Sequence, residues 1–357
     1  MNKNIIKSIS NKTLGILGGG QLGKMIATEA SRLGIKTCIF DPNKTSPAFQ
    51  SANIIFNEQY NDKKALKKFA NYCDVITYEF ENIPLESIHF LKGLSKVYPE
   101  IRALRYSQDR YKEKKFISSL NIPVAPFYIV NSINDIKKAL SKLEGSAIIK
   151  TRRLGYDGKG QHVIKNFDIP VKFKNIKKNQ YILEGIINFK KEISIIAMKT
   201  KQGEVICFEP SENKHRKGIL REAIFPANIS SKVNKNAKKI VKDIIMSLNI
   251  IGIVAIEMFI DQNNNVIVNE IAPRPHNSGH WTMDACNISQ HEALVRTIFD
   301  VPLPVIKYYH NCKMINILGE NYDLINTAMS NKNYKVYIYG KDSIKPERKL
   351  GHINILY

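Results

Sequence analysis

The sequence Asn269-Glu-Ile-Ala-Pro-Arg-Pro-His-Asn-Ser-Gly-His-Trp-Thr282 gathers a carboxylate, an arginine, two histidines and amides around two prolines and a glycine. Such a composition is typical of a functional site and not of a hydrophobic core. Two apolar segments, 252–260 and 266–270, lead into it, and the polar sequence Asp261-Gln-Asn-Asn-Asn265 separates them. This arrangement predicts a β-hairpin that ends at the site.

The predicted hairpin brings two carboxylates together. With a loop at 262–265, Glu257 lies directly opposite Glu270. Facing carboxylates repel by some tenths of a kcal/mol, so we expect a cation between them. Oxygen ligands without a nearby cysteine favour Mg²⁺, with substrate phosphates completing its coordination. The alternative is a pair of solvated strand carboxylates, but the neighbouring Asn269 and the loop that follows favour the metal.

Length and composition limit the class of protein. A chain of 357 residues, 43% of them hydrophobic, is long enough for two or three domains with cores of their own. The formal net charge of +22 is compatible with nucleic-acid binding. However, the lysines are scattered among asparagine and isoleucine, and the sequence has no RNA-recognition pattern, zinc-finger spacing or long charge block. We therefore expect no nucleic-acid partner.

The cysteines and the apolar runs indicate the compartment. The five cysteines are far apart and odd in number, so they predict neither a disulfide framework nor a metal site. No run approaches the roughly 20 apolar residues of a membrane helix, and no apolar signal segment precedes Leu14. These features predict a cytoplasmic protein whose cysteines are reduced and which has no membrane partner.

The first third of the chain alternates between strand and helix patterns. Strands are expected at 14–17, 35–40, 53–56 and 74–79, with helices after Gly23 and over 65–72. This pattern predicts a doubly wound, Rossmann-like domain, in which active residues lie at the carboxyl ends of the strands. Asp41 and Glu79 occupy such ends.

The remaining chain is richer in strands. We expect strands at 146–150, 180–184, 192–197 and 205–208, helices at 109–120, 233–248 and 289–299, and a tail of a few strands and turns from Lys307. The predicted fold class is therefore mixed α/β and α+β. Its predicted domains are residues 1–113, 114–304 and 305–357.

Two glycine clusters suggest phosphate binding. Gly18-x-Gly20-x-x-Gly23 with Asp41 matches the dinucleotide fingerprint of a nicotinamide-dependent oxidoreductase, but its backbone amides can equally hold a substrate phosphate or form a tight turn without a ligand. The second cluster follows Lys150 and reads Gly155-Tyr-Asp-Gly-Lys-Gly160. It predicts a loop that folds over phosphates, with a solvated hairpin as the alternative. A dehydrogenase has no need of this second loop.

The order of these motifs resembles the ATP-grasp ligases. The shared features are a lysine at a strand end, a glycine-rich flap, a Glu-x-x-Ile hinge at Glu184 and a carboxylate pair ending in Asn-Glu. The flap and the sequence His276-Asn-Ser-Gly-His280 are similar to those of the ATP-grasp enzymes that carboxylate aminoimidazole ribonucleotide in purine synthesis. The resemblance extends from Leu14 to about Leu356.

The resemblance implies a set of roles for individual residues. The residues that it places around ATP are Arg110, Lys150, Gly155, Tyr156, Asp157, Gly158, Lys159, Gly160, Gln161, Glu184, Gly185, Ile186, Ile187, Glu192, His215, Asn269 and Glu270. It assigns Mg²⁺ to Glu257 and Glu270. The residues that it places at the substrate are Gln21, Glu79, Arg274, His276, Asn277, Ser278, Lys341, Arg348 and Lys349, and the catalytic ones are Tyr156, Asp157, Arg274, His276 and Lys341.

The implied chemistry uses ATP and Mg²⁺ to phosphorylate bicarbonate, after which aminoimidazole ribonucleotide forms a carbamate on its exocyclic amine. Mg²⁺ and lysine would neutralise the transferring phosphoryl group, and the closed flap would exclude water. A homodimer is expected, together with a shortened carboxy-terminal domain and a disordered amino-terminal extension. The alternatives are another ATP-grasp carboxylate–amine ligase, a nicotinamide-dependent oxidoreductase, or a binding protein that has lost catalysis.

Overall fold

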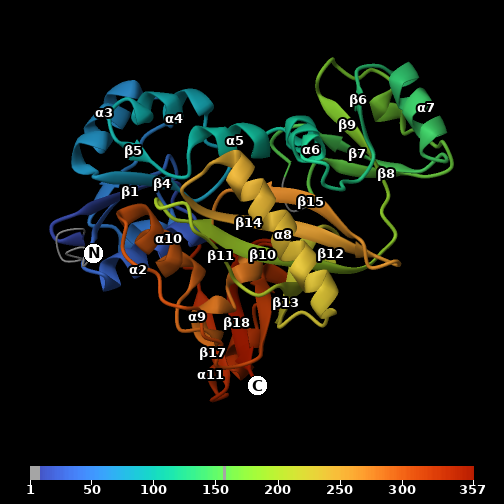
Figure 1. The fold of residues 1–357 in the computed structure, drawn as a ribbon. Coiled ribbons are helices and arrows are strands. Elements are labelled where there is room, and N and C mark those ends of the chain that lie inside the picture. Colours follow the sequence, from blue (N-terminus) through green and yellow to red (C-terminus); the bar gives the residue numbers. More distant parts are fainter. Residues whose placement is uncertain (1–8, 156–157) are drawn as a thin grey trace.

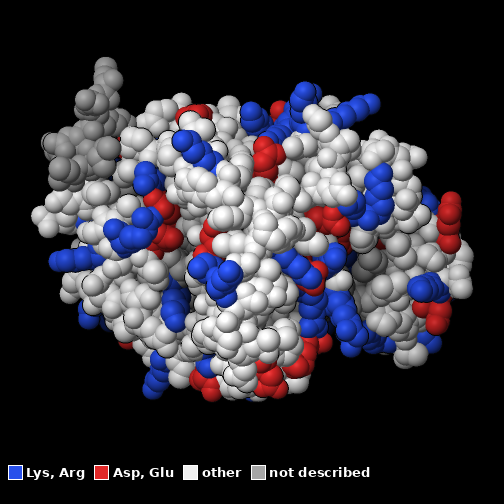
Figure 2. Space-filling view, turned by 90° about the horizontal axis from the view of Figure 1, so that it is seen from below, with Lys and Arg blue, Asp and Glu red and all other residues white. Residues whose placement is uncertain are grey.

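The computed structural model describes residues 9–155 and 158–357, which form the three parts seen in Figure 1. Residues 1–8 of the predicted amino-terminal extension and the flap residues Tyr156 and Asp157 lie outside the described residues, whereas Ile9, at the end of that extension, packs against the core. Within residues 9–155 and 158–357, no helix combines the length and apolarity needed to cross a membrane. Lys and Arg side chains are distributed among acidic and uncharged residues on the face shown in Figure 2.

The amino-terminal part is a parallel sheet with the strand order β3-β2-β1-β4-β5. Its elements are β1 (Thr13–Leu17), α2 (Gln21–Arg32), β2 (Lys36–Phe40), β3 (Ile54–Phe56), α3 (Lys63–Tyr72), β4 (Val75–Tyr78), α4 (Leu85–Lys92), β5 (Lys96–Val97) and α5 (Ile101–Ser107). The apolar residues of β1 are fully buried, as expected for a strand covered on both faces. The predicted doubly wound domain is therefore confirmed.

A small antiparallel sheet follows, with the order β6-β9-β7-β8. Its elements are α6 (Arg110–Ser119), β6 (Phe127–Val130), α7 (Ile133–Lys142), β7 (Ala147–Thr151), β8 (Gln161–Ile164) and β9 (Tyr181–Gly185). This lid sheet is the green part of Figure 1, and α6 lies between it and the amino-terminal domain. The sequence patterns predicted β7, β9 and α6 but did not reveal β6, α7 and β8.

The largest sheet joins the remaining strands in the order β15-β14-β10-β12-β13-β16-β18-β17, with β11 on β10. The strands are β10 (Phe189–Lys199), β11 (Val205–Cys207), β12 (Ser211–Arg216), β13 (Ile219–Phe225), β14 (Gly252–Asp261), β15 (Val266–Ala272), β16 (Cys312–Leu318), β17 (Tyr334–Ile338) and β18 (Lys349–Leu356). The helices are α8 (Ser231–Leu248), α9 (Thr282–Ala285), α10 (Gln290–Phe299) and α11 (Leu324–Met329). Because β13 pairs with β16, the carboxy-terminal strands extend the same sheet.

Two features of this sheet differ from the prediction. The tail was expected to contain only strands and turns, but α11 packs beside β17 and β18 in a small core with Ile325 and Ile353. Strands β12 and β13 were also missed. In β12 the buried positions are Ser211 and Asn213, so the strand lacks the apolar alternation that sequence patterns detect.

Candidate active site

The hairpin of β14 and β15 brings Glu257 opposite Glu270, as predicted. The predicted loop was one residue too short, because the first pair of the hairpin is Ile260 with Val266, which leaves 261–265 as the loop. Pairing continues to Met258 with Val268, and the register then shifts so that Asn269 is left as an extra residue. This β-bulge restores the pairing of the two glutamates.

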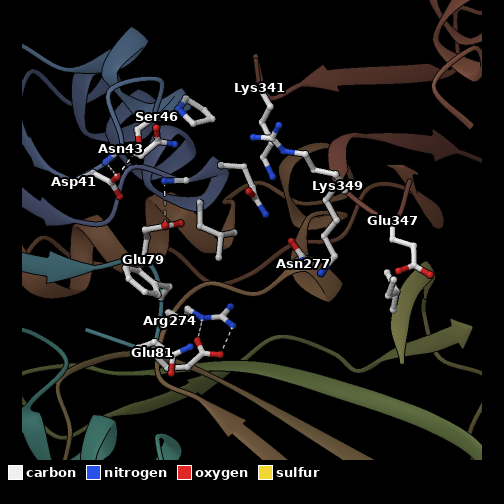
Figure 3. Close-up of a pocket in the computed structure, with 18 of the residues that line it drawn as sticks. Asp41, Asn43, Ser46, Glu79, Glu81, Arg274, Asn277, Lys341, Glu347 and Lys349 are labelled. Atoms are coloured by element: carbon white, nitrogen blue, oxygen red, sulfur yellow. Dashed lines mark hydrogen bonds and ion pairs between the residues drawn. The ribbon is translucent and has the colours of Figure 1, made fainter. Parts of the chain in front are cut away.

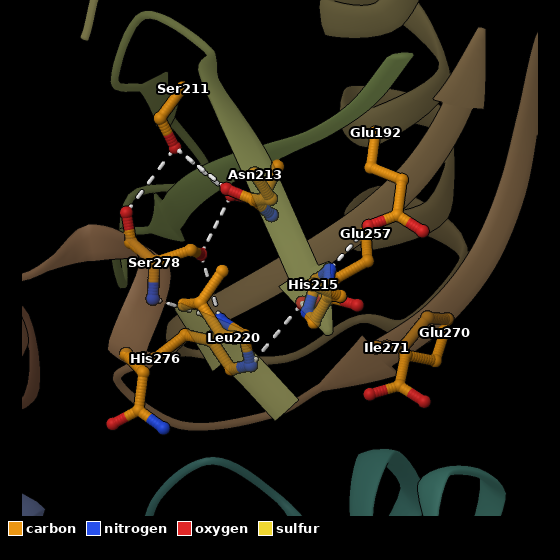
Figure 4. Close-up of polar contacts among 12 residues, drawn as sticks. Glu192, Ser211, Asn213, His215, Leu220, Glu257, Glu270, Ile271, His276 and Ser278 are labelled. Atoms are coloured by element: carbon orange, nitrogen blue, oxygen red, sulfur yellow. Dashed lines mark hydrogen bonds and ion pairs between the residues drawn. The ribbon is translucent and has the colours of Figure 1, made fainter. Parts of the chain in front are cut away.

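An arginine and two histidines lie close to the two carboxylates. Figure 4 shows the histidines, of which His215 is cationic, whereas burial lowers the pKa of His276 and keeps it neutral. Arg110 Nη1 lies 3.4 Å from Glu270 Oε2, while Nε2 of His276 and of His215 lie 3.6 Å and 4.0 Å from Glu257 Oε1. Burial and the charge of Glu270 raise the pKa of Glu257 to about 7. Burial opposes protonation of His215, but its hydrogen bond to Glu192 and the charge of Glu257 raise its pKa to about 9. Burial and Glu270 thus disfavour the charged form of Glu257 by more than the nearby His215 favours it.

A cavity of about 420 Å³ lies between α6, the lid sheet and this hairpin. The predicted nucleotide residues that line it are Arg110, Lys150, Gly155, Gly158, Gln161, Glu192, His215, Asn269 and Glu270. Lys150 Nζ donates a 2.8 Å hydrogen bond to Glu184 Oε2. Burial opposes ionisation of Glu184, but the charges of Lys114 and Lys150 lower its pKa to about 2. Glu184 thus anchors the lysine and does not itself line the cavity.

The flap and the hinge lie at the edge of this cavity. Gly158 and Gly160 both have positive φ angles, and a Cβ on Gly158 would lie 2.6 Å from the carbonyl oxygen of Lys217. The flap therefore needs glycine to pack against the turn between β12 and β13. Lys159 lines the neighbouring cavity. In the hinge, Gly185 ends β9 in a buried position, Ile186 is exposed and Ile187 is half-buried.

A second cavity of about 730 Å³ separates the amino-terminal domain from the tail (Figure 3). The predicted substrate residues that line it are Gln21, Glu79, Arg274, Asn277, Lys341, Arg348 and Lys349. Lys341 and Lys349 reach in from the tail, opposite Glu79 and Asp41. The cavity thus has an acidic wall and a cationic wall.

The amides of the amino-terminal glycine turn are already bound within the protein. Gly19 N donates to Asp41 Oδ2 at 2.7 Å, and Gly20 N and Gly23 N donate to the two Glu79 oxygens at 3.0 and 3.3 Å. The amides of Gly19, Gly20 and Gly23 are therefore not available to a substrate phosphate in this structure. Glu79 occupies the position at the start of α2 where an anion would be favoured.

The same contacts argue against the dinucleotide interpretation. Asp41 also accepts hydrogen bonds from Ser46 Oγ at 2.8 Å and from Tyr60 Oη at 2.9 Å. Both of its carboxylate oxygens are thus engaged by protein donors. A ribose-binding acid must instead offer its oxygens to the ribose hydroxyls.

Arg274 and Asn277 line both cavities and so mark where they meet. Arg274 is held by Glu81, which accepts from Arg274 Nε and, at 3.0 Å, from Arg274 Nη2. Despite burial, the charge of Glu81 raises the pKa of Arg274 further above its usual range. Glu81 was not among the predicted site residues, although its position two residues after Glu79, just past the end of β4, is typical of an active residue in a parallel sheet.

His276 and Ser278 lie behind the carboxylate pair (Figure 4). His276 Nδ1 accepts from the Ser278 backbone N–H at 3.3 Å, and the Ser278 hydroxyl lies 2.8 Å from the same nitrogen. The other ring nitrogen, Nε2, therefore carries the proton and faces Glu257. Ser278 is fully buried against Ser194, so the structure does not bring it to either cavity, although it was predicted to contact the substrate.

Comparison with known proteins identifies the class. Residues 115–291 match the ATP-grasp domain, residues 11–108 match the ribonucleotide synthetase preATP-grasp domain, and residues 312–357 match the phosphoribosylaminoimidazole carboxylase C-terminal domain. The chain thus has the domains of an ATP-grasp ligase, and the predicted fold class is confirmed.

Similar sequences and structures give the family. The chain is 39% identical over 358 residues to N5-carboxyaminoimidazole ribonucleotide synthase of Bacillus subtilis, covering 100% of this chain and 94% of that protein. N5-carboxyaminoimidazole synthetase of Staphylococcus aureus complexed with ADP has a TM-score of 0.93 at 39% identity, covering 97% of this chain and 93% of that one. The Aspergillus clavatus synthase in complex with ADP and 5-aminoimidazole ribonucleotide has a TM-score of 0.89 at 28% identity, covering 97% and 94%. The chain belongs to the N5-carboxyaminoimidazole ribonucleotide synthase family, which confirms the resemblance described above.

Proposed function

We propose that this protein carboxylates 5-aminoimidazole ribonucleotide with bicarbonate, at the expense of ATP, to give N5-carboxyaminoimidazole ribonucleotide in purine synthesis. The observation that carries the proposal is the meeting of two differently built cavities at Arg274 and Asn277. One cavity has the lysine, arginine and carboxylates suited to a nucleotide. The other has the cationic wall suited to a second phosphate-bearing substrate.

ATP would occupy the smaller cavity. Lys150 and Arg110 are placed to neutralise its phosphates, and the flap from Gly155 would cover them. The residues present fit Mg²⁺, because Glu257 and Glu270 are half-buried carboxylates that face each other in the cavity, and burial and their mutual repulsion raise the pKa of Glu257. Within the described part of the chain, no three His, Cys, Asp or Glu side chains are grouped to hold a metal alone, so ATP oxygens would complete the shell. When bound, Mg²⁺ would neutralise charge on the transferring phosphoryl group.

Aminoimidazole ribonucleotide would occupy the larger cavity, with its phosphate against Lys341, Arg348 and Lys349. Arginine is suited to this task because its planar guanidinium binds phosphate oxygens in pairs. The exocyclic amine would then point toward Arg274, where the cavities join.

The reaction would take place at this junction. Bicarbonate oxygen attacks the γ-phosphorus of ATP, giving carboxyphosphate and ADP, and the charge of Arg274 stabilises the anion. The exocyclic amine then attacks the carbonyl carbon, the bond between that carbon and the phosphate oxygen breaks, and the departing phosphate can take the amine proton. His276, with Nε2–H directed at Glu257, orients that carboxylate and is not free to act as a base from Nδ1.

A coupled assay tests the proposal. We expect phosphate release from ATP that requires bicarbonate and rises on addition of aminoimidazole ribonucleotide, with the carbamate product detected by mass spectrometry. Phosphate release that ignores the ribonucleotide would favour another ATP-grasp carboxylate–amine ligase. Omission of Mg²⁺ and size-exclusion chromatography with light scattering would test the predicted metal and homodimer, and fractionation of the source cells would test the predicted cytoplasmic location.

A further inference from the structure

Helix α6 carries two adjacent charged residues, Glu113 and Lys114, that are each only 2% exposed. Both reach the backbone of β15. Glu113 Oε1 accepts a 2.7 Å hydrogen bond from the Ile271 N–H, and Lys114 Nζ donates a 3.1 Å hydrogen bond to the Asn269 carbonyl. These two backbone groups flank Glu270 on either side. Helix α6 therefore binds the backbone of β15 on both sides of Glu270, one of the two facing carboxylates.

The backbone that Glu113 and Lys114 contact belongs to β15, an edge strand of the large sheet. Strand β15 pairs only with β14 in the described sheet order, so its outer edge needs other partners. Just before the bulge, Val268 N–H donates to the Pro123 carbonyl at 2.8 Å. Glu113 and Lys114 continue this row of contacts along the edge, past the point where the bulge interrupts regular pairing.

The bulge itself decides which side chain faces Glu257. On the loop side of the bulge, Met258 pairs with Val268. If that register continued, Asn269 would lie opposite Glu257, and Glu270 would turn to the other face of the sheet, since side chains alternate along a strand. The extra residue at Asn269 prevents this. An interaction that fixes the bulge therefore keeps Glu270 in the cleft.

We propose that Glu113 and Lys114 are positioning residues that fix the bulge at Asn269 and so keep Glu270 beside Glu257. Lys114 Nζ also lies 3.4 Å from Glu184 Oε2, which holds Lys150. Through Lys114, helix α6 thus contacts both β15, which carries Glu270, and Glu184, which holds Lys150 on the lid sheet. The structural part of the proposal stands on the contacts alone. Its consequence for Mg²⁺ and nucleotide rests on the proposed function.

The role of Glu113 requires a hydrogen-bond acceptor and not a charge. In Glu113→Gln the amide oxygen can still accept from the Ile271 N–H, whereas Glu113→Met has a similar size and no acceptor. Glu113→Asp retains the charge but shortens the side chain by one methylene, so its oxygen no longer reaches. Lys114→Met removes the donor to Asn269, and Lys115→Met on the exposed side of α6 is its matched control.

The test measures ADP affinity by calorimetry with and without Mg²⁺, and hydrogen exchange of the peptide that contains 266–272. We expect Glu113→Met and Lys114→Met to weaken ADP binding in Mg²⁺ at least tenfold and to speed exchange in β15 but not in β14. Glu113→Met should change metal-free ADP binding less than threefold. The metal-free comparison uses this variant alone, because Lys114 also contacts Glu184, which holds Lys150. Glu113→Gln and Lys115→Met should stay within threefold of wild type. If Glu113→Met does not fold, Glu113→Asp takes its place with the same expected losses.

Two results would overturn the positioning role. One is a Gln variant that loses as much Mg²⁺-dependent affinity as the Met variant, since the charge would then matter. The other is unchanged exchange of β15 in Glu113→Met or its Asp replacement. Neither measurement requires aminoimidazole ribonucleotide or turnover. If the protein does not carry out the proposed carboxylation, this test can still be made. Failure of the positioning role and failure of the proposed function can therefore be told apart.

Discussion

Glu257 and Glu270 face each other across the β14–β15 hairpin only because Asn269 forms a bulge between them and the hairpin loop. The strand is thus built to present two carboxylates to the same cavity, against the repulsion that opposes them. Burial and this repulsion raise the pKa of Glu257 to about 7. Such a pair is expected where a divalent cation is to be bound.

We predict that Glu270→Gln abolishes ATP turnover while leaving the fold intact. The amide has the same volume as the carboxylate but cannot balance the charge of Mg²⁺. Phosphate release and a thermal melt measure the two properties, and Glu204→Gln, at an exposed position in the turn before β11, is the control. Turnover within threefold of wild type would refute the metal assignment.

Patterns along the chain predicted the elements but not the contacts between distant ones. The alternation of strands and helices correctly placed Asp41 and Glu79 at strand ends. The predicted hairpin paired Glu257 with Glu270 with a shorter loop and no bulge, and in the structure the longer loop and the bulge at Asn269 offset each other. The bulge at Asn269 depends on partners in α6, which lies 155 residues earlier for the Lys114 contact. No local pattern records such a contact.

The same limit applies to the cleft. Arg274 and Glu81 are 193 residues apart in the chain, so their ion pair has no local signature. Strand β12 was missed because polar residues fill its buried positions, where a strand of the core would carry apolar ones. Functional surfaces break the hydrophobic pattern, and this is why sequence patterns lose them.

Replacing Asp41 tests the abandoned oxidoreductase hypothesis. We expect Asp41→Ala to lower the melting temperature by several degrees, because the Gly19 amide, Ser46 hydroxyl and Tyr60 hydroxyl lose their acceptor. Each buried donor left without an acceptor lowers the free energy of unfolding by about 1–3 kcal/mol. Calorimetry with NAD should detect no binding to either protein. A dissociation constant for NAD that worsens in the variant would revive the hypothesis.

The tail supplies a separate prediction. Arg348→Ala should raise the KM for aminoimidazole ribonucleotide at least tenfold, because losing one of the cations around a partly desolvated phosphate costs roughly 2–5 kcal/mol. The KM for ATP should change little, since Arg348 lines only the larger cavity. Asp342→Ala is the matched control, because it removes the 2.8 Å ion-pair partner of Arg348 but keeps the cation. An equal effect of both substitutions, or a change in the KM for ATP, would contradict the assignment.

Three buried histidines lie close together. His280 precedes α9, His291 lies in α10, and His352 lies in β18 of the tail. The ring centroids of His280 and His352 are 4.4 Å apart, and those of His280 and His291 are 5.7 Å apart. Burial lowers the pKa of His291 and of His352 to about 3, and burial also lowers the pKa of His280 well below its usual value. The folded protein therefore binds fewer protons than the unfolded chain, in which histidine titrates near pH 6.5. The stability from these groups is complete above about pH 6.5 and is lost as the pH falls toward 3.

We predict that His291→Leu reduces this acid sensitivity. A buried histidine that stays neutral lowers the stability by about 1 kcal/mol between pH 6.5 and 5.5, because the unfolded histidine goes from half to almost fully protonated over that unit. The variant should therefore lose about 1 kcal/mol less than wild type over this range. At pH 7.5 it should be no less stable, because neither ring nitrogen of His291 has a hydrogen-bond partner among the described residues. Urea denaturation at pH 7.5, 6.5 and 5.5 measures the difference, with His310→Leu at an exposed position as control. Equal pH dependence in His291→Leu and wild type would show that His291 is already protonated in the folded protein.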